Sequence, residues 1–214
     1  MHGTAAVPAK IKRSRKSFWL KQLHMWHWMS SAISLVGMLL FAITGFTLNH
    51  AADIEATPQV REGRVQLPPA LLRQVAPDDA DDAKKPLPPE LARWIATNLP
   101  FSGKGEAEWS ADEVYLAQPR PGGDGWVAID RTTGEVTSEA TSRGWIAYLN
   151  DLHKGRNSGP AWSWFIDIFA AASVIFSLTG LVLLWMHSKH RRSTWPLVGA
   201  GLVIPALIAI FLIH

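Results

Sequence analysis

Residues 23–50, LHMWHWMSSAISLVGMLLFAITGFTLNH, decide how this chain folds. Within them, 18 residues from Ser31 to Leu48 carry no charge, and histidines stand on both sides, His24 and His27 before and His50 after. About 20 apolar helical residues cross a hydrocarbon core of roughly 30 Å, so this stretch predicts a transmembrane helix. At about 1.5 Å per residue, His27 and His50 would lie roughly 34 Å apart along the axis, one near each membrane face.

Two further apolar runs, Trp162–Met186 and Trp195–Ile213, predict two more spans. Lysines and arginines without any acid precede the first span, and the loop His187–Thr194 between the other two is also strongly basic. By the positive-inside rule both basic segments face the cytoplasm, which places the segment between the first two spans outside. The first apolar run is too long for the core of a secretory signal, so we expect an uncleaved anchor.

The polar segment between the first two spans predicts a small α+β domain with an antiparallel sheet. Proline pairs in Leu67–Val75 and Leu87–Asn98 suit the first turn of two short helices. The charged stretch 76–86 is interpreted as a linker or exposed loop. The remaining expected elements are strands at 105–109, 113–118, 125–130 and 135–138, a hairpin through 131–134, and a helix at 145–152.

The predicted fold class is an α-helical membrane protein with three transmembrane helices and a small α+β extracytoplasmic domain. Its expected parts, in order, are a basic cytoplasmic N-terminus (1–21), the first span (22–50), the extracytoplasmic domain (51–160), the second span (161–187), a basic cytoplasmic loop (188–194) and the third span (195–214).

Cysteine is absent from the 214 residues, which excludes disulfides, thiolate metal sites and covalently attached c-type haem. The formal net charge of +3 is mild, and the basic residues cluster beside apolar runs. That pattern indicates orientation in a membrane and not nucleic-acid binding. The lipid bilayer is therefore the first expected partner, and no nucleic acid is expected.

Histidines at the ends of the predicted spans are the main chemical signal. Two opposed imidazoles from separate helices would fill both axial positions of a haem, which suits electron transfer and not oxygen binding. The alternative for any one of them is a wet anchor at the membrane interface. The candidate ligands are His24, His27, His50, His153 and His187.

Asp167 is the one acid within a predicted span. An intramembrane carboxylate is costly and faces water or a partner. Here the partner is Arg156 or Lys154, or else a histidine whose ring the carboxylate orients.

A short repeat links the first two spans. Residues 41–48 read FAITGFTL and residues 176–183 read FSLTGLVL. Because the two spans run in opposite directions, the copies would lie near opposite membrane faces. A chance match between apolar sequences is the alternative.

Several segments together resemble the PepSY-associated transmembrane family, over residues from about 20 to 186. They are LHMW at 23–26, TG at 44–45, LNH at 48–50, DLHKG at 151–155, Gly159, Trp164, Asp167 and TGLVLLW at 179–185. The extracytoplasmic segment, with DRTTGE at 130–135, resembles a PepSY unit. The resemblance implies a bacterial inner-membrane protein, similar to the ferric-siderophore reductases, with its central domain in the periplasm.

The resemblance further implies b-type haem, one or two groups, with His24, His50 and His153 at the matching positions. His27 and His187 are added from helix geometry. The chain has three spans where the larger reductases have four or more, so a homodimer is one way to complete the haem sites. The expected partners are a ferric siderophore or another ferric chelate, and a quinol or cytoplasmic electron donor.

Two other functions stay open. The chain could be a non-enzymatic, membrane-anchored adaptor, accessory to a metal-uptake system, whose outer domain recruits peptides at a strand edge. A third function is copper or zinc handling by the pair His50 and His153.

Overall fold

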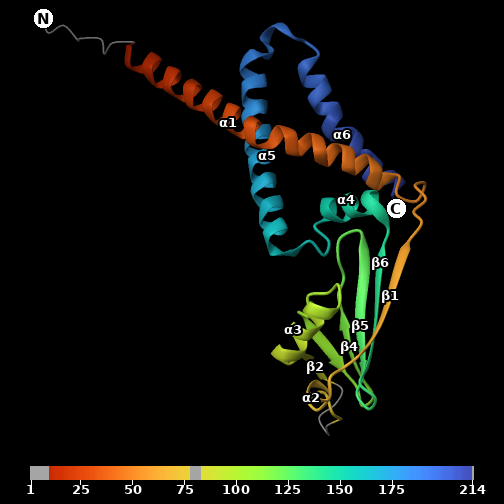
Figure 1. Cartoon of the computed structure of the whole chain (residues 1–214). Helices are drawn as coiled ribbons and strands as arrows, with labels where there is room; N and C mark the ends of the chain where they lie inside the picture. Colours follow the sequence, from red (N-terminus) through yellow and green to blue (C-terminus); the bar gives the residue numbers. More distant parts are fainter. Residues whose placement is uncertain (1–9, 78–82, 214) are drawn as a thin grey trace, which may run out of the picture. The chain divides into compact units, whose positions relative to one another are not determined.

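The computed structural model of the chain describes residues 10–77 and 83–213 (Figure 1). Residues 1–9 of the predicted N-terminus, 78–82 of the predicted linker, and His214 lie outside the described residues. The described chain divides into two compact units, one within Met1–Met38 and Asp167–His214 and the other formed by Leu39–Ile166. Each unit is described by itself.

Three helices are long and apolar enough to cross a membrane, namely α1 (Lys10–Asn49), α5 (Gly159–His187) and α6 (Thr194–Leu212). Most of their large apolar side chains are exposed, as lipid-facing helices require. Pro205 lies inside α6, and the helix continues through it. The prediction of three helices of membrane-spanning type is confirmed.

In the first unit, α1 and α5 approach closely at small residues. A Cβ atom added to Gly37 would lie 2.5 Å from the ring of Phe169, so the α5 aromatic ring fills the space that this glycine leaves. Ser34 on α1 is fully buried and donates its hydroxyl proton to the carbonyl of Ser30. Small residues at helix contacts are the usual means of close packing in membranes, where hydrophobic burial gives no drive.

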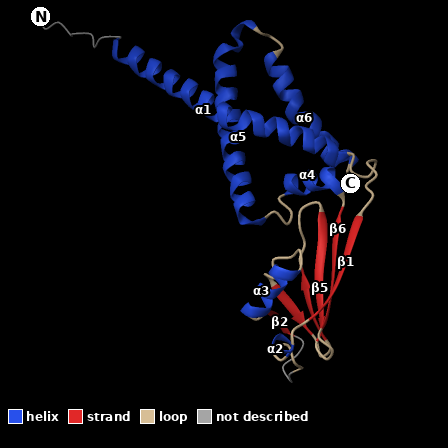
Figure 2. Cartoon of the chain, in the orientation of Figure 1, coloured by secondary structure: helices blue, strands red, loops and turns tan. Residues whose placement is uncertain are grey.

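The second unit contains one six-stranded antiparallel sheet in the order β1-β6-β5-β4-β3-β2, drawn in red in Figure 2. Alternate residues of the central strands, such as Val114, Leu116 and Ile129, are buried at 1% exposure or less. The strands are β1 (Gln59–Gln66), β2 (Ala83–Pro86), β3 (Glu106–Trp109), β4 (Glu113–Ala117), β5 (Gly123–Asp130) and β6 (Glu135–Ser142).

Two helices cover one face of this sheet, α2 (Pro69–Leu72) and α3 (Pro89–Asn98). Each follows an edge strand through the same tripeptide, Leu-Pro-Pro, at residues 67–69 and 87–89. Proline suits the first helical turn because the missing N–H would have no partner there. The leucine of each tripeptide is buried in the core, so the sheet is framed by two copies of one strand–helix unit.

The sequence-based expectation of four strands was too low. β1 was missed because its side chains are almost all exposed, and an edge strand with one wet face and a charged pattern shows little alternation. β2 lies in the stretch interpreted as a linker, where Lys84 and Lys85 hide the strand pattern. The four expected strands, the two short helices and the antiparallel sheet are all present.

The hairpin between β5 and β6 forms as predicted. Gly134 adopts a left-handed conformation with φ of +72°. The Asp130 carboxylate accepts hydrogen bonds from the N–H groups of Thr132 (2.9 Å) and Thr133 (2.7 Å). These bonds hold the pKa of Asp130 below its ordinary value, the backbone N–H and the hydroxyl of Thr133 being the main causes.

Candidate functional site

The first unit holds one imidazole between α1 and α5. His27 on α1 lies against Phe176, Thr179 and Gly180 of α5. Its Nδ1 is 3.0 Å from the hydroxyl oxygen of Thr179, and its ring stacks on Phe176 with centroids 4.8 Å apart and planes 13° from parallel. A Cβ atom on Gly180 would lie 3.3 Å from His27 Cε1, so the glycine lets the ring approach the helix.

The second unit holds another imidazole in the same way. His153 lies on α4 (Gly144–Lys154) and contacts Phe41, Thr44 and Gly45 of α1. Its Nδ1 is 2.7 Å from the Thr44 hydroxyl oxygen, and its ring lies on Phe41 with centroids 4.9 Å apart and planes at 46°. A Cβ atom on Gly45 would lie 3.4 Å from His153 Cε1.

The two sites use corresponding positions of the repeat noted in the sequence. In both copies of F-x-x-T-G, the phenylalanine lies against the imidazole ring, the threonine hydroxyl bonds to Nδ1, and the glycine lies beside Cε1. Phe176 stacks on its ring whereas Phe41 is tilted, and an added Cβ atom would be tight at Gly180 but in ordinary contact at Gly45. We call this segment the F-x-x-T-G cradle, at residues 41–45 and 176–180. The repeat is visible in the sequence, but the histidine that contacts each copy is not. No local sequence pattern indicates which distant side chain will contact the repeat.

The proton on each imidazole can be placed by following the threonine hydroxyl. Thr44 donates to the carbonyl of Leu40 (2.9 Å), and Thr179 donates to that of Ile175 (2.7 Å). Because each hydroxyl has one proton, its oxygen must accept from the histidine, which therefore carries its proton on Nδ1. In a neutral ring the lone pair then lies on Nε2, which makes no hydrogen bond to the described residues of its unit in either site.

The other three candidate histidines also carry the proton on Nδ1, but their hydrogen bonds lie at exposed positions. His24 and His187 are exposed and donate from Nδ1 to the carbonyls of Leu20 and Leu183, each at 2.8 Å. His50 is 45% exposed and donates to the Asp53 carboxylate at 3.1 Å. Thus in all five candidate imidazoles Nδ1 carries the proton, and Nε2 makes no hydrogen bond to the described residues of its own unit.

Within each unit, the described candidate ligands contact other residues and not one another. Within each unit, no two of the five imidazoles share a hydrogen bond or a ring contact among the described residues. Asp167 is exposed and makes no hydrogen bond or ion pair with the described residues of its own unit. Nor do residues 10–77 and 83–213 contain three or more metal-ligating side chains grouped for an ion.

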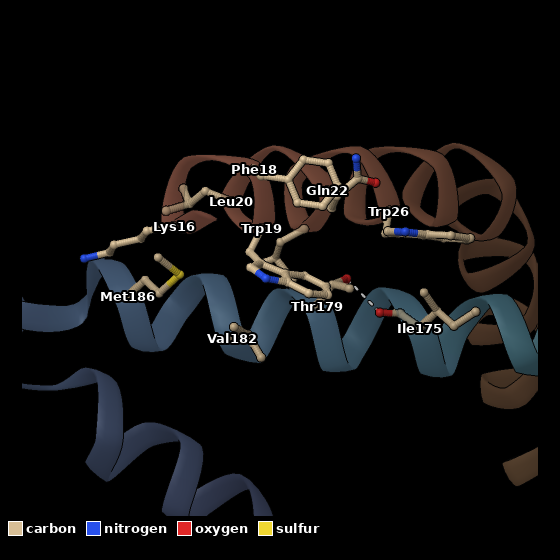
Figure 3. Close-up of a pocket in the computed structure, with 11 residues that line it drawn as sticks. Lys16, Phe18, Trp19, Leu20, Gln22, Trp26, Ile175, Thr179, Val182 and Met186 are labelled. Carbon is tan, nitrogen blue, oxygen red and sulfur yellow. Dashed lines mark hydrogen bonds between the residues drawn. The ribbon is translucent and has the colours of Figure 1, made fainter. Parts of the chain in front are cut away.

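A groove of about 720 Å³ runs between α1 and α5 in the first unit, beside the His27 site (Figure 3). The Thr179 hydroxyl that holds His27 is on its wall, and the indoles of Trp19 and Trp26 face it from α1. Lys16 is the one charged residue of the lining, which is otherwise almost entirely apolar. The groove can therefore hold a flat, lipid-soluble molecule next to the imidazole support.

The comparisons with known proteins agree with this architecture. A family model described as "Putative PepSY_TM-like" matches residues 18–214, nearly the whole chain, and the chain belongs to this family. No curated protein and no solved structure matches it. The family membership supports a membrane protein with a PepSY-type domain and leaves the chemistry to be argued from the site.

Proposed function

We propose that this chain is a b-type haem protein of the bacterial inner membrane that carries electrons to a ferric chelate, such as a ferric siderophore, on the periplasmic side. The observation that carries the proposal is the pair of F-x-x-T-G cradles, each of which bonds one imidazole at Nδ1, while Nε2 has no hydrogen bond to the described residues of the same unit. A metal-ligating histidine characteristically has its other ring nitrogen fixed by a hydrogen bond, which orients the ring and makes it a better donor.

The donor chemistry of the chain fits haem. Imidazole nitrogens are available, thiolates are absent, and the described residues offer no three-ligand site that would favour zinc or copper instead. Haem iron held by two imidazoles exchanges single electrons and keeps no open position for oxygen. His27 and His153 are the primary ligands in this proposal, with His24, His50 and His187 as the further imidazoles.

A complete site needs a second imidazole for each iron. In this proposal a second copy of this chain supplies that ligand, and the functional unit is a homodimer. A homodimer would also give the exposed apolar flank of α5 a partner other than lipid.

The chain's own residues would position the electron path. The threonines fix the tautomers of His27 and His153, and the phenylalanines restrict rotation of the rings. Under the positive-inside orientation, His27 serves the cytoplasmic half of the membrane and His153 the periplasmic half. The groove beside Thr179, with indole walls and no acidic lining residue, suits the ring of a quinol as electron donor.

The test is spectroscopic. We expect full-length protein, purified in detergent from haem-replete cells, to give a reduced-minus-oxidised spectrum of bis-imidazole haem. His27→Ala and His153→Ala should each remove about half of the signal, and the double variant nearly all of it. His2→Ala, outside every predicted span, is the matched control and should change nothing. A colourless wild type, or an unchanged spectrum in the double variant, would refute the proposal.

A second candidate function rests on a different observation. β1 is an edge strand of eight residues whose side chains are mostly exposed, and such an edge can pair with an extended peptide. In that case the chain would be a membrane-anchored adaptor, accessory to a metal-uptake system. Replacing all five candidate histidines would then leave cellular function intact, whereas the haem proposal expects its loss.

A further inference from the structure

Helix α4 is amphipathic in the reverse sense to a water-soluble helix. Trp145, Tyr148 and Leu149 share one face by their three- and four-residue spacing, and they are 77%, 37% and 36% exposed. The opposite face carries Asn150 and Asp151, which are 7% and 5% exposed. A soluble domain places such faces the other way round, because exposing apolar surface costs about 25 cal/mol per Å². This helix is built for surroundings that are less polar than water.

The contacts of α4 within the second unit fix its position along the axis of α1. His153 is bonded to Thr44, and the Thr47 hydroxyl donates to Asn150 Oδ1 at 2.8 Å. Both threonines belong to the last turns of α1, whose apolar stretch ends at Asn49. On the other side, only residues 155–158 separate α4 from α5, a linker that spans at most roughly 18 Å. The C-terminal half of α4 is thus tied to the end of α1 and, through a short linker, to the start of α5.

Basic side chains border a pocket of about 600 Å³ between α4 and the segment that follows α1. Arg143, Lys154 and Arg156 line it together with Trp145. Lys154 and Arg156 form no side-chain ion pair with the described residues of this unit. Of the two acids in the lining, Asp151 is already satisfied by the N–H of Gly122 (2.8 Å) and by Arg143 (3.4 Å), which leaves only Glu55 against the free cations.

We propose that α4 lies in the headgroup layer of the membrane, with its Trp145–Tyr148–Leu149 face toward the acyl chains, and that the basic pocket takes the phosphate of a phospholipid. Indole and phenol side chains favour this layer because one part is apolar and one part is polar. Lysine and arginine beside them place their charges at lipid phosphates. The interaction holds the sheet domain close to the bilayer and sets the position of His153. It does not depend on haem.

The depth of α4 can be measured because the chain contains no cysteine of its own. Leu149→Cys would be spin-labelled in full-length protein in lipid nanodiscs, with Thr132→Cys in the exposed β5–β6 hairpin as the matched control. We expect the Leu149 label to collide more often with oxygen than with a water-soluble nickel complex, and the Thr132 label to show the reverse. Equal nickel access at both positions would overturn the placement of the helix.

The phosphate pocket has its own test. Native mass spectrometry of the wild type is expected to retain phospholipid, and Lys154→Gln with Arg156→Gln should reduce the retained number by at least one. Lys84→Gln with Arg93→Gln, on the exposed surface of the sheet domain, is the control pair. Free inorganic phosphate should not displace the lipid, because the acyl chains supply part of the binding; if it does, the pocket is a soluble-anion site. Equal retention in both double variants would refute the pocket.

Discussion

The two F-x-x-T-G cradles make the same contacts but differ in how firmly they are built. In the second unit Thr44 is buried at 4% exposure, and α4 is tied again to α1 by Thr47 and Asn150. A further bond joins the indole N–H of Trp162 to the carbonyl of Leu152, next to His153, at 2.8 Å. In the first unit Thr179 is only partly buried, and His27 has one hydrogen bond and one stacked ring.

The two copies of the motif therefore differ in the number of contacts that hold the imidazole and the helix that carries it. His153 is held by a network that fixes helix α4 as well as the ring, so its position changes only if the network breaks. His27 lies on the long helix α1, is held by its contacts with α5 alone, and has a groove beside it.

The largest expected effect comes from filling the glycines of the two cradles. Gly45→Leu and Gly180→Leu each drive a side chain into the space taken by an imidazole, at a cost of about 1–3 kcal/mol in the free energy of unfolding. The larger loss is expected at Gly45, because the extra bonds prevent α4 from moving away. Thermal unfolding in detergent would measure both. Gly199→Leu on α6, where a Cβ atom meets nothing within 4 Å, is the control. Equal effects at all three glycines would mean that neither cradle is tightly packed.

Removing the hydroxyls deletes one hydrogen bond from each cradle and leaves the packing of the ring in place. Thr44→Val leaves the Nδ1–H of His153 without its acceptor next to a buried position, at a cost of about 1–3 kcal/mol, whereas Thr179→Val costs about 1 kcal/mol because Thr179 is only partly buried. The spectrum of any bound haem should shift in both variants, since the ring is no longer oriented.

The control for the hydroxyl series is Thr97→Val on α3. Thr97 donates to the carbonyl of Arg93 at 2.9 Å, as the cradle threonines do to their own helices, but it holds no histidine. Unfolding curves and spectra of the three variants, recorded side by side, separate two losses. One is the loss of the threonine's bond to its own helix, and the other is the loss of its bond to the imidazole. If Thr97→Val is as costly as Thr44→Val, the bond to His153 contributes nothing measurable.

How far sequence reasoning reaches differs between the two units. The spans could be predicted because long uncharged runs have one stable solution in a bilayer, and the hairpin at 131–134 because its turn needs glycine at one position. The edge strands β1 and β2 could not, because half-exposed, charged strands owe their conformation to pairing with neighbours and not to their own pattern. The histidines could be predicted as candidate ligands from their residue type and position. Their hydrogen-bond partners could not, because these depend on contacts between distant segments, such as Thr44 with His153 across 109 positions.

Arg131 shows the same limit inside the sheet domain. It sits in the predicted hairpin and reads as an ordinary turn residue, yet it is 3% exposed. Its guanidinium donates to the carbonyls of Val75 (2.7 Å), Ala76 (2.6 Å) and Ser110, and so binds the end of the α2 segment to the sheet. A buried arginine of this kind leaves no signal in the local sequence, because its acceptors are backbone carbonyls that any residue supplies.

The smallest expected effect is a pH dependence of the unfolding temperature that comes from the second unit alone. The pKa of Asp130 is lowered in the folded sheet, so its bonds to the hairpin stabilise the second unit above the ordinary aspartate pKa of about 3.9, and this contribution is lost as the pH falls through the lowered value. In Asp130→Asn the amide oxygen can still accept the two N–H bonds, but the charge and its pH dependence are gone. Wild type should therefore unfold at a slightly higher temperature than the variant at pH 7, and the two curves should converge toward pH 3.

The first unit contains no part of this hairpin, so the spectral signal of a ligand at His27 should stay the same in both proteins over that range. A shift of that signal with the Asp130 substitution would show that the two units are coupled. The two cradles would then act as parts of one linked system and not independently.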